Sequence, residues 1–265
     1  MEFITVRGHR LEYERIASVD AETPTIVFLH EGLGSLSLWR DFPRRVAAAT
    51  GHPALVYSRY GYGQSDPITE PRRVDFMHEE GLETLPALLD QLEIERPILL
   101  GHSDGASISL LYAGGTGRAV TALILMAPHL FVEEMCIKSI EAARETYATT
   151  DLRERLARHH ANPDSAFRGW NDIWLHPDFP QWNIEAYVPP IQVPILAIQG
   201  ENDEYGTMEQ VDRLARLAPQ TELLKLANCR HSPHRDQPQA VIDSAAKFIK
   251  KISMSSANKT VRRAK

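Results

Sequence analysis

The feature that most constrains this chain is a short apolar run that leads directly into a serine held between glycines. Residues Pro97–Leu100 read as a buried β-strand, and Gly101-x-Ser103-x-Gly105 follows at once. The small and apolar residues Ala106–Tyr112 then read as a helix. A serine at such a strand-to-helix turn needs glycine on both sides, because a Cβ at either position would collide with the neighbouring strand or helix. The pattern therefore predicts a nucleophilic Ser103 on a strained turn at the end of a strand.

The rest of the chain alternates short apolar runs with helical segments. Each run is nearly continuous in apolar residues, which is typical of parallel strands covered on both faces. A β-hairpin formed by Phe3–Val6 and Arg10–Ile16 precedes them. The pattern predicts an α/β fold with a mostly parallel, doubly wound sheet, whose functional site lies at the carboxyl ends of the strands. The expected strands are Thr25–Leu29, Ala54–Ser58, Pro97–Leu100, Ala122–Met126, Pro194–Gln199 and Glu222–Ala227, and the expected helices are Leu38–Thr50, Phe76–Leu92, Asp104–Gly114, Met208–Leu217 and Pro238–Ile252.

Length, charge and cysteine content restrict the class of protein. A chain of 265 residues can bury one sizeable core, and a net charge of −6 argues against nucleic acid as a partner. No apolar run reaches the roughly 18–20 residues of a membrane span, and the N-terminus lacks the pattern of a signal peptide. The two cysteines, Cys136 and Cys229, have no ligand-spaced neighbours, so we expect reduced thiols and no metal site. The sequence thus predicts a cytoplasmic monomer or homodimer that acts on a small molecule and binds no membrane.

One interval, residues 129–190, is too long for a simple connection between strands. It looks helical at first and then becomes rich in aromatic residues and proline, so we predict a helical cap inserted into a core domain of residues 1–128 and 191–252. Residues 253–265 are rich in Ser, Asn, Lys and Arg, and we expect them to form a disordered tail. The cap's aromatic residues could form its own small core or line a pocket. The candidates for substrate binding are Trp170, Trp174, Trp182 and His129.

A serine hydroxyl needs a base, and the base needs an acid that orients it. A later strand ends in a polar turn that carries Asp203, our choice for the acid. The loop after the last strand carries His231, which we prefer to His234 as the base because it lies nearer the strand end. Other histidines have plainer interpretations; His159 and His160, for instance, look like a solvated helix end. The alternatives for the acid are Glu204, Glu201, Glu133 and Glu134.

Acyl transfer also needs N–H donors for the developing oxyanion. One donor is expected to be the backbone N–H of Asp104, directly after the candidate nucleophile. The second is expected in the loop His30–Ser35, where Gly32 and Leu33 are both candidates. This loop lacks the lysine and the glycine spacing of a nucleotide-binding loop. The Asp104 carboxylate suits the first turn of a helix, and it could also disfavour anionic acyl groups.

Together these motifs resemble the α/β-hydrolase superfamily, and within it the capped bacterial serine hydrolases that include esterases, C–C bond hydrolases and lactonases. The order Ser103, Asp203, His231 is the order of this superfamily. Glu31 departs from its pattern, since a glycine often follows the histidine of the first loop. The matching motifs span nearly the whole chain and are His30–Gly34, Ser58–Ser65, Gly101–Gly105, Gly200–Asp203 and His231–His234.

The resemblance implies a capped α/β-hydrolase fold with Ser103 as the nucleophile, Asp203 as the acid and His231 as the base. Relatives that open epoxides or remove halides carry an aspartate at the turn, so a serine there argues against both reactions. We expect a carboxylic ester hydrolase that works through an acyl-enzyme and needs no cofactor. The alternatives are a C–C bond hydrolase or a lactonase on the same triad and, less favoured, an acyltransferase or a non-catalytic ligand receptor.

Overall fold

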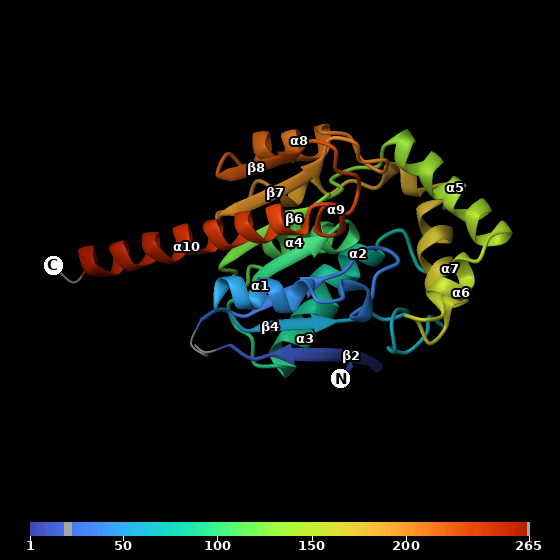
Figure 1. The fold of residues 1–265 in the computed structure, drawn as a ribbon, viewed down its shortest axis with the longest axis horizontal. Helices are drawn as coiled ribbons and strands as arrows, with labels where there is room; N and C mark the ends of the chain where they lie inside the picture. The colour runs from blue at the N-terminus through green and yellow to red at the C-terminus, as the bar shows by residue number, and fades with distance from the viewer. Residues whose placement is uncertain (19–22, 264–265) are drawn as a thin grey trace.

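The computed structural model describes residues 1–18 and 23–263, and the strands in this part of the chain form an eight-stranded sheet (Figure 1). The strands are β1 (Glu2–Val6), β2 (His9–Ile16), β3 (Ile26–Leu29), β4 (Ala54–Tyr57), β5 (Ile98–His102), β6 (Ala122–Met126), β7 (Ile195–Gly200) and β8 (Thr221–Leu226). Their order in the sheet is β1-β2-β4-β3-β5-β6-β7-β8. β1 pairs antiparallel with β2, and β2 with β4, whereas all later pairs are parallel. The predicted α/β fold, with its N-terminal hairpin and mostly parallel sheet, is confirmed.

Helices cover both faces of the sheet (Figure 1). They are α1 (Phe42–Thr50), α2 (Phe76–Glu79), α3 (Leu85–Gln91), α4 (Asp104–Gly115), α8 (Glu209–Leu217), α9 (Pro233–Asp236) and α10 (Pro238–Arg263). Successive residues of a strand face opposite sides of a sheet. In β3, Phe28 packs in one core with residues of α1 and α10, while Val27 and Leu29 pack in a second core with residues of α3, α4 and α8. The central strands β3 to β7 are buried on both faces and read as nearly continuous apolar runs, whereas β1, β2 and β8 carry exposed residues.

The helix predicted over residues 76–92 is interrupted in the structure. A π-helical turn, η2 (Glu80–Thr84), lies between α2 and α3. Two residues account for it. Gly81 packs against α4, where a Cβ would lie 2.8 Å from the Cβ of Leu111, and Pro86 has no N–H to donate to the preceding turn. The helix predicted from residue 38 likewise divides into a short turn, η1 (Ser37–Trp39), and α1, with Arg40 at a φ of 53° between them.

A helical segment, residues 129–190, connects β6 to β7, and we call it the insertion. Its elements are α5 (Glu134–Thr149), α6 (Leu152–Leu156), α7 (Pro163–Trp174), η3 (Phe179–Gln181) and η4 (Glu185–Tyr187). Figure 1 shows α5, α6 and α7 together at one end of the molecule, opposite the end where the C-terminus projects. A bridge between Phe131 and Asn183 ties the two ends of the insertion together. The insertion therefore leaves the sheet and returns to it at neighbouring points.

The C-terminal segment differs from the prediction. α10 continues to Arg263, so residues 253–263 are helical where a disordered tail is predicted, and residues 264–265 lie outside the described part of the chain. Neither glycine nor proline occurs between residues 239 and 263, so nothing in the backbone ends the helix. Figure 1 shows this end of α10 projecting beyond the sheet. Among the described helices, none has both the length and the apolar character needed to cross a membrane.

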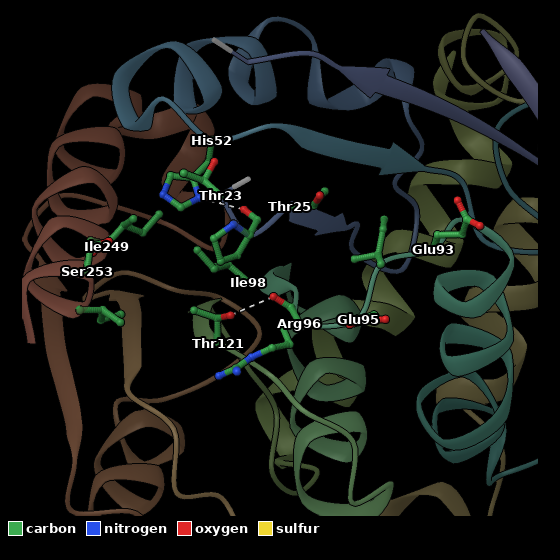
Figure 2. A pocket seen from close by; sticks show the side chains of 13 residues that line it. Thr23, Thr25, His52, Glu93, Glu95, Arg96, Ile98, Thr121, Ile249 and Ser253 are labelled. Carbon is green, nitrogen blue, oxygen red and sulfur yellow. Dashed lines mark hydrogen bonds between the residues drawn. The ribbon is translucent and has the colours of Figure 1, made fainter. Parts of the chain in front are cut away.

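A pocket of about 650 Å³ lies at the amino ends of the parallel strands (Figure 2). Its walls include Thr25 and Ile98, where β3 and β5 begin, and Thr121, whose hydroxyl donates a 2.8 Å hydrogen bond to the carbonyl of Arg96. Ser103 follows the carboxyl end of β5, at the opposite edge of the sheet. This pocket is therefore separate from the candidate nucleophile.

Candidate active site

The turn between β5 and α4 presents Ser103 in a backbone conformation that a serine rarely adopts. Its φ is 52° and its ψ is −118°, and its N–H donates a 2.9 Å hydrogen bond to the carbonyl of Met126 on the neighbouring strand. A Cβ at Gly101 would lie 2.6 Å from the Cα of Ala106, and one at Gly105 would collide with the carbonyl of Leu29. Both glycines are thus required by close backbone approach, as the sequence predicts. The strained turn holds the serine side chain above the first turn of α4.

The need for glycine at position 105 can be measured. Gly105→Ala is expected to lower the free energy of unfolding by about 1–3 kcal/mol or more, because overpacking a tight site costs at least this much. Urea denaturation followed by circular dichroism measures the change. Gly206→Ala is the matched control, since a methyl group there would have its nearest neighbour at an ordinary 3.4 Å. Equal stability of Gly105→Ala and the wild type would contradict the packing argument.

The structure brings the three residues of the predicted triad together from three loops. Ser103 Oγ lies 3.0 Å from His231 Nε2, and His231 Nδ1 lies 2.8 Å and 2.9 Å from the two carboxylate oxygens of Asp203. Burial alone would lower the pKa of His231, but the charge and hydrogen bonds of the Asp203 carboxylate raise it above its ordinary value. Because Nδ1–H donates to Asp203, the unprotonated Nε2 faces the serine hydroxyl. This is the geometry in which an imidazole can accept a proton from a serine.

Asp203 is held by neighbours that sequence reasoning did not identify. Gln199 Nε2 donates a 2.8 Å hydrogen bond to its Oδ2, and the backbone N–H of Tyr205 donates a 2.8 Å bond to its Oδ1. Burial would raise the pKa of Asp203, but the interaction with His231 and these bonds hold it below its ordinary value. Asp203 is therefore an anion fixed in orientation. Gln199 is the last residue with a side chain in β7, before the turn that carries Asp203. No sequence pattern pointed to a role for its amide.

The alternative acids and the alternative base occupy other positions. Glu204 accepts a 3.1 Å hydrogen bond from the backbone N–H of His231 rather than from its ring. Glu133 binds the backbone N–H and the hydroxyl of Thr207, and Glu134 forms an ion pair on the surface with Lys138. His234 is buried, with its ring 4.8 Å from that of Trp39. In this arrangement the imidazole beside Ser103 is that of His231.

His102 contacts the loop that carries His231. Its Nε2 donates a 2.7 Å hydrogen bond to the backbone carbonyl of His231. The carboxylate of Glu31 lies 3.4 Å from its Nδ1, and Glu31 also forms a 2.9 Å ion pair with Arg235. Glu31, which departs from the family pattern, thus links the loop after β3 to the loop after β8.

The candidate oxyanion donors lie on two segments that meet near Ser103. In the described residues, the backbone N–H groups of Gly32, Leu33 and Asp104 donate to no protein acceptor. The loop of Gly32 and Leu33 is held by Arg59, a buried residue to which the sequence analysis gave no role. Its Nη2 donates a 2.9 Å hydrogen bond to the carbonyl of Glu31. The Asp104 carboxylate is buried 3.6 Å from the Arg59 guanidinium. Burial raises the pKa of the Asp104 carboxyl above its ordinary value, against the opposing effect of the Arg59 charge.

A pocket of about 250 Å³ opens beside Ser103. Its lining combines apolar and aromatic side chains with charged ones, which are Glu31, Glu204 and Arg235. Burial lowers the pKa of His129, one of the three imidazoles in the lining, to about 3, so that ring is neutral. Trp182 is absent from the lining and stacks on Phe179 with 5.8 Å between ring centroids. Trp182 is buried in the core that the insertion shares with one face of the sheet. The wall residues include Gly32, Leu33, His129, Cys136, Ile140, Trp170, Trp174 and Tyr205.

The sequence model described as "Alpha/beta hydrolase family" matches residues 26–244 of this chain. The chain belongs to the alpha/beta hydrolase family. This match covers every parallel strand of the sheet and all three residues of the predicted triad. The family identification confirms the resemblance that the sequence motifs carry.

Relatives in the alpha/beta hydrolase family differ in the reactions that their names state. The chain is 32% identical over 260 residues to a 2-hydroxy-6-oxononadienedioate/2-hydroxy-6-oxononatrienedioate hydrolase of Cupriavidus pinatubonensis, with 86% of this chain and 88% of that protein covered. It is 24% identical over 265 residues to the sn-1-specific diacylglycerol lipase ABHD11 of Mus musculus, with 87% and 82% covered. The crystal structure of an enol-lactonase from Burkholderia xenovorans LB400 shares the fold, with a TM-score of 0.74, 20% identity, and 94% and 100% covered. The comparisons establish a hydrolase.

Proposed function

We propose that this alpha/beta hydrolase is a serine hydrolase that cleaves a carboxylic ester through an acyl-enzyme. The observation that carries the proposal is the continuous hydrogen-bonded chain from Ser103 Oγ through His231 to Asp203. Each member has the environment that its role requires: a strained turn for the nucleophile, a raised pKa for the base and a fixed anion for the acid. The Asp203 carboxylate stabilises the imidazolium that forms when His231 takes a proton.

The proposed cycle uses protein groups and water. His231 Nε2 takes the proton of Ser103 while Oγ attacks the ester carbonyl carbon. The tetrahedral oxyanion is stabilised by the N–H of Asp104 and by an N–H from Gly32 or Leu33. The C–O bond then breaks, and the alcohol leaves with the proton that His231 returns. Water, activated by the same imidazole, attacks the acyl-enzyme, and the carboxylic acid is released with Ser103 restored.

A further part of the proposal is that the insertion acts as a cap over the site. Trp170 and Trp174 reach from α7 to the wall of the pocket beside Ser103, and Cys136 and Ile140 reach it from α5. The pocket's volume of about 250 Å³ suits a small acyl group. The proposed substrate is therefore an ester with a compact acyl part.

A C–C bond hydrolase is the second candidate, and the identity of 32% to the Cupriavidus hydrolase favours it over the remaining alternatives. Both reactions could use the same serine and the same oxyanion donors. The substrate in that case would be a dienoic diketone, whose C–C bond breaks after attack on a carbonyl. A lactonase would differ from the esterase only in keeping the alcohol attached to the acyl part.

Labelling with a fluorophosphonate tests the serine hydrolase, and a substrate panel separates the reactions. We expect intact mass to show one adduct on the wild-type protein and none on Ser103→Ala. Absence of an adduct on folded wild type would contradict an activated serine. Steady turnover of a small ester at a higher kcat/KM than a lactone or a dienoic diketone would support the esterase. A preference for the diketone or for the cyclic substrate would replace it with the corresponding alternative.

A further inference from the structure

His160 lies where the insertion meets the loop of the candidate oxyanion donors. It follows α6 and is buried, although the sequence suggests a solvated helix end at this position. Its Nδ1 accepts a 3.0 Å hydrogen bond from the backbone N–H of Gly63, in the loop after β4. Its Nε2 lies 3.2 Å from the backbone carbonyl of Leu33. One ring of the insertion thus bridges two loops of the core.

The partners of the His160 ring determine its protonation state. A backbone N–H can only donate and a carbonyl can only accept, so both bonds form only when Nδ1 is bare and Nε2 carries the proton. Burial lowers the pKa of His160 to about 4, which keeps this neutral form near neutral pH. The ring is consequently a directional connector with one acceptor and one donor.

The bond to Leu33 acts on the backbone that carries a candidate oxyanion donor. The carbonyl and the N–H of Leu33 lie in adjacent peptide planes that share the Leu33 Cα. Fixing the carbonyl therefore holds one of these planes, and the N–H can turn away only by rotation about φ and ψ of Leu33. On the other side of this loop, a Cβ at Gly32 would collide with the indole of Trp170. The loop is therefore confined by two residues of the insertion, and from the core by Arg59, which binds the carbonyl of Glu31.

Other contacts hold the same part of the insertion without reaching this loop. The N–H of Ala161 donates a 2.8 Å hydrogen bond to the carbonyl of Gly63. The hydroxyl of Ser165, in the first turn of α7, accepts a 2.9 Å bond from the N–H of Ile68. These bonds secure the insertion to the loop after β4. Among them, the Nε2 bond of His160 is the one that reaches Leu33.

We propose that His160 is a positioning residue that orients the Leu33 N–H for oxyanion binding, so that the oxyanion site is complete only when the insertion is seated. This inference rests on the proposed function. It assigns to the insertion a role in catalysis besides enclosing the substrate. The Gly32 N–H lies in the peptide plane of the Glu31 carbonyl, which Arg59 binds, so the candidate donor that responds to His160 is the N–H of Leu33.

A pair of amide substitutions separates the two bonds of His160. The amide of His160→Asn can replace Nδ1 and keep the bond from Gly63, but it is too short to reach Leu33. The longer amide of His160→Gln can donate from the position of Nε2. We expect His160→Asn to lower kcat about tenfold with KM within twofold, since complete loss of an oxyanion donor costs on the order of 10²–10³. His160→Gln should restore most of the loss. Ser165→Ala removes one bond between the insertion and the loop after β4 but leaves the bonds of His160 and Ala161, so the insertion should stay seated and kcat should stay within twofold of the wild type.

Two further readouts exclude a merely structural effect. Active sites are counted by fluorophosphonate titration, so that kcat refers to reactive protein only. Affinity for a trifluoromethyl ketone, whose adduct places an oxyanion in the site, should fall in His160→Asn by the same factor as kcat/KM. An equal loss in both amide variants, or unchanged inhibitor affinity, would overturn the inference while leaving the proposed function intact. A wild-type protein that forms no adduct would overturn both.

Discussion

Ser103→Ala is expected to lower kcat about a millionfold, because the nucleophile and its base act as one unit and removal of either one abolishes the acyl-enzyme route. His231→Ala should cost about as much, and the double variant should be no slower than either single variant. Residual activity above the uncatalysed rate would come from binding and from the oxyanion donors. The measurement is kcat for a chromogenic ester under single-turnover and steady-state conditions.

A second serine of the same helix provides the control for this experiment. Ser109 lies in α4, is buried, and donates a 2.7 Å hydrogen bond to the carbonyl of Gly105. Ser109→Ala removes a buried hydroxyl from the same element without touching the hydrogen-bonded chain, so it should keep kcat within a few-fold of the wild type. If the losses in Ser103→Ala and His231→Ala multiplied in the double variant, the two residues would act independently, and the proposed proton transfer between them would be wrong.

The sequence predicts the strands well because the physical cause of each strand is local. β3, β5 and β6 are buried on both faces, so each appears as a continuous apolar run. The predicted bounds of β6 match the observed ones, and those of β3 and β5 differ by at most two residues. The position of the site can be predicted from the same strands, since the residues that follow the carboxyl ends of parallel strands lie at one edge of the sheet. Asp203 and His231 could be selected because each follows such a strand.

The residues that the sequence missed depend on contacts between distant segments. His160 has the local setting of an exposed helix end, and its burial results from Gly63 and Leu33, which are about 100 residues or more away in the chain. Arg59 serves the site through a hydrogen bond to the loop after β3, which no spacing rule reveals. Gln199 is different, because its amide binds the carboxylate of Asp203 only four residues ahead. Composition likewise identifies an aromatic segment but not which of its rings face the pocket: Trp170 and Trp174 line it, and Trp182 does not.

Asp203→Asn should reduce kcat about 10⁴-fold, because the amide no longer fixes the tautomer that leaves Nε2 of His231 free to accept a proton. The side chain keeps its size, so the protein should remain folded. Glu204→Gln is the comparison, since Glu204 binds the backbone N–H of His231 and should matter far less. Near-normal activity of Asp203→Asn would remove Asp203 from the triad and direct attention to Glu204, Glu133 and Glu134.

The pH profile of Asp203→Asn gives an independent test with a definite sign. His231 must be neutral to act as a base, so activity falls as the pH drops through its pKa. In the wild type the Asp203 carboxylate raises that pKa above its ordinary value of 6.5 against the opposing effect of burial. Removing the charge leaves burial unopposed by this carboxylate, so the acidic limb of kcat/KM should move to lower pH. Loss of an adjacent anion can only destabilise the imidazolium and lower the pKa of His231. An acidic limb that stays in place or moves to higher pH would therefore mean that a group other than His231 controls the activity.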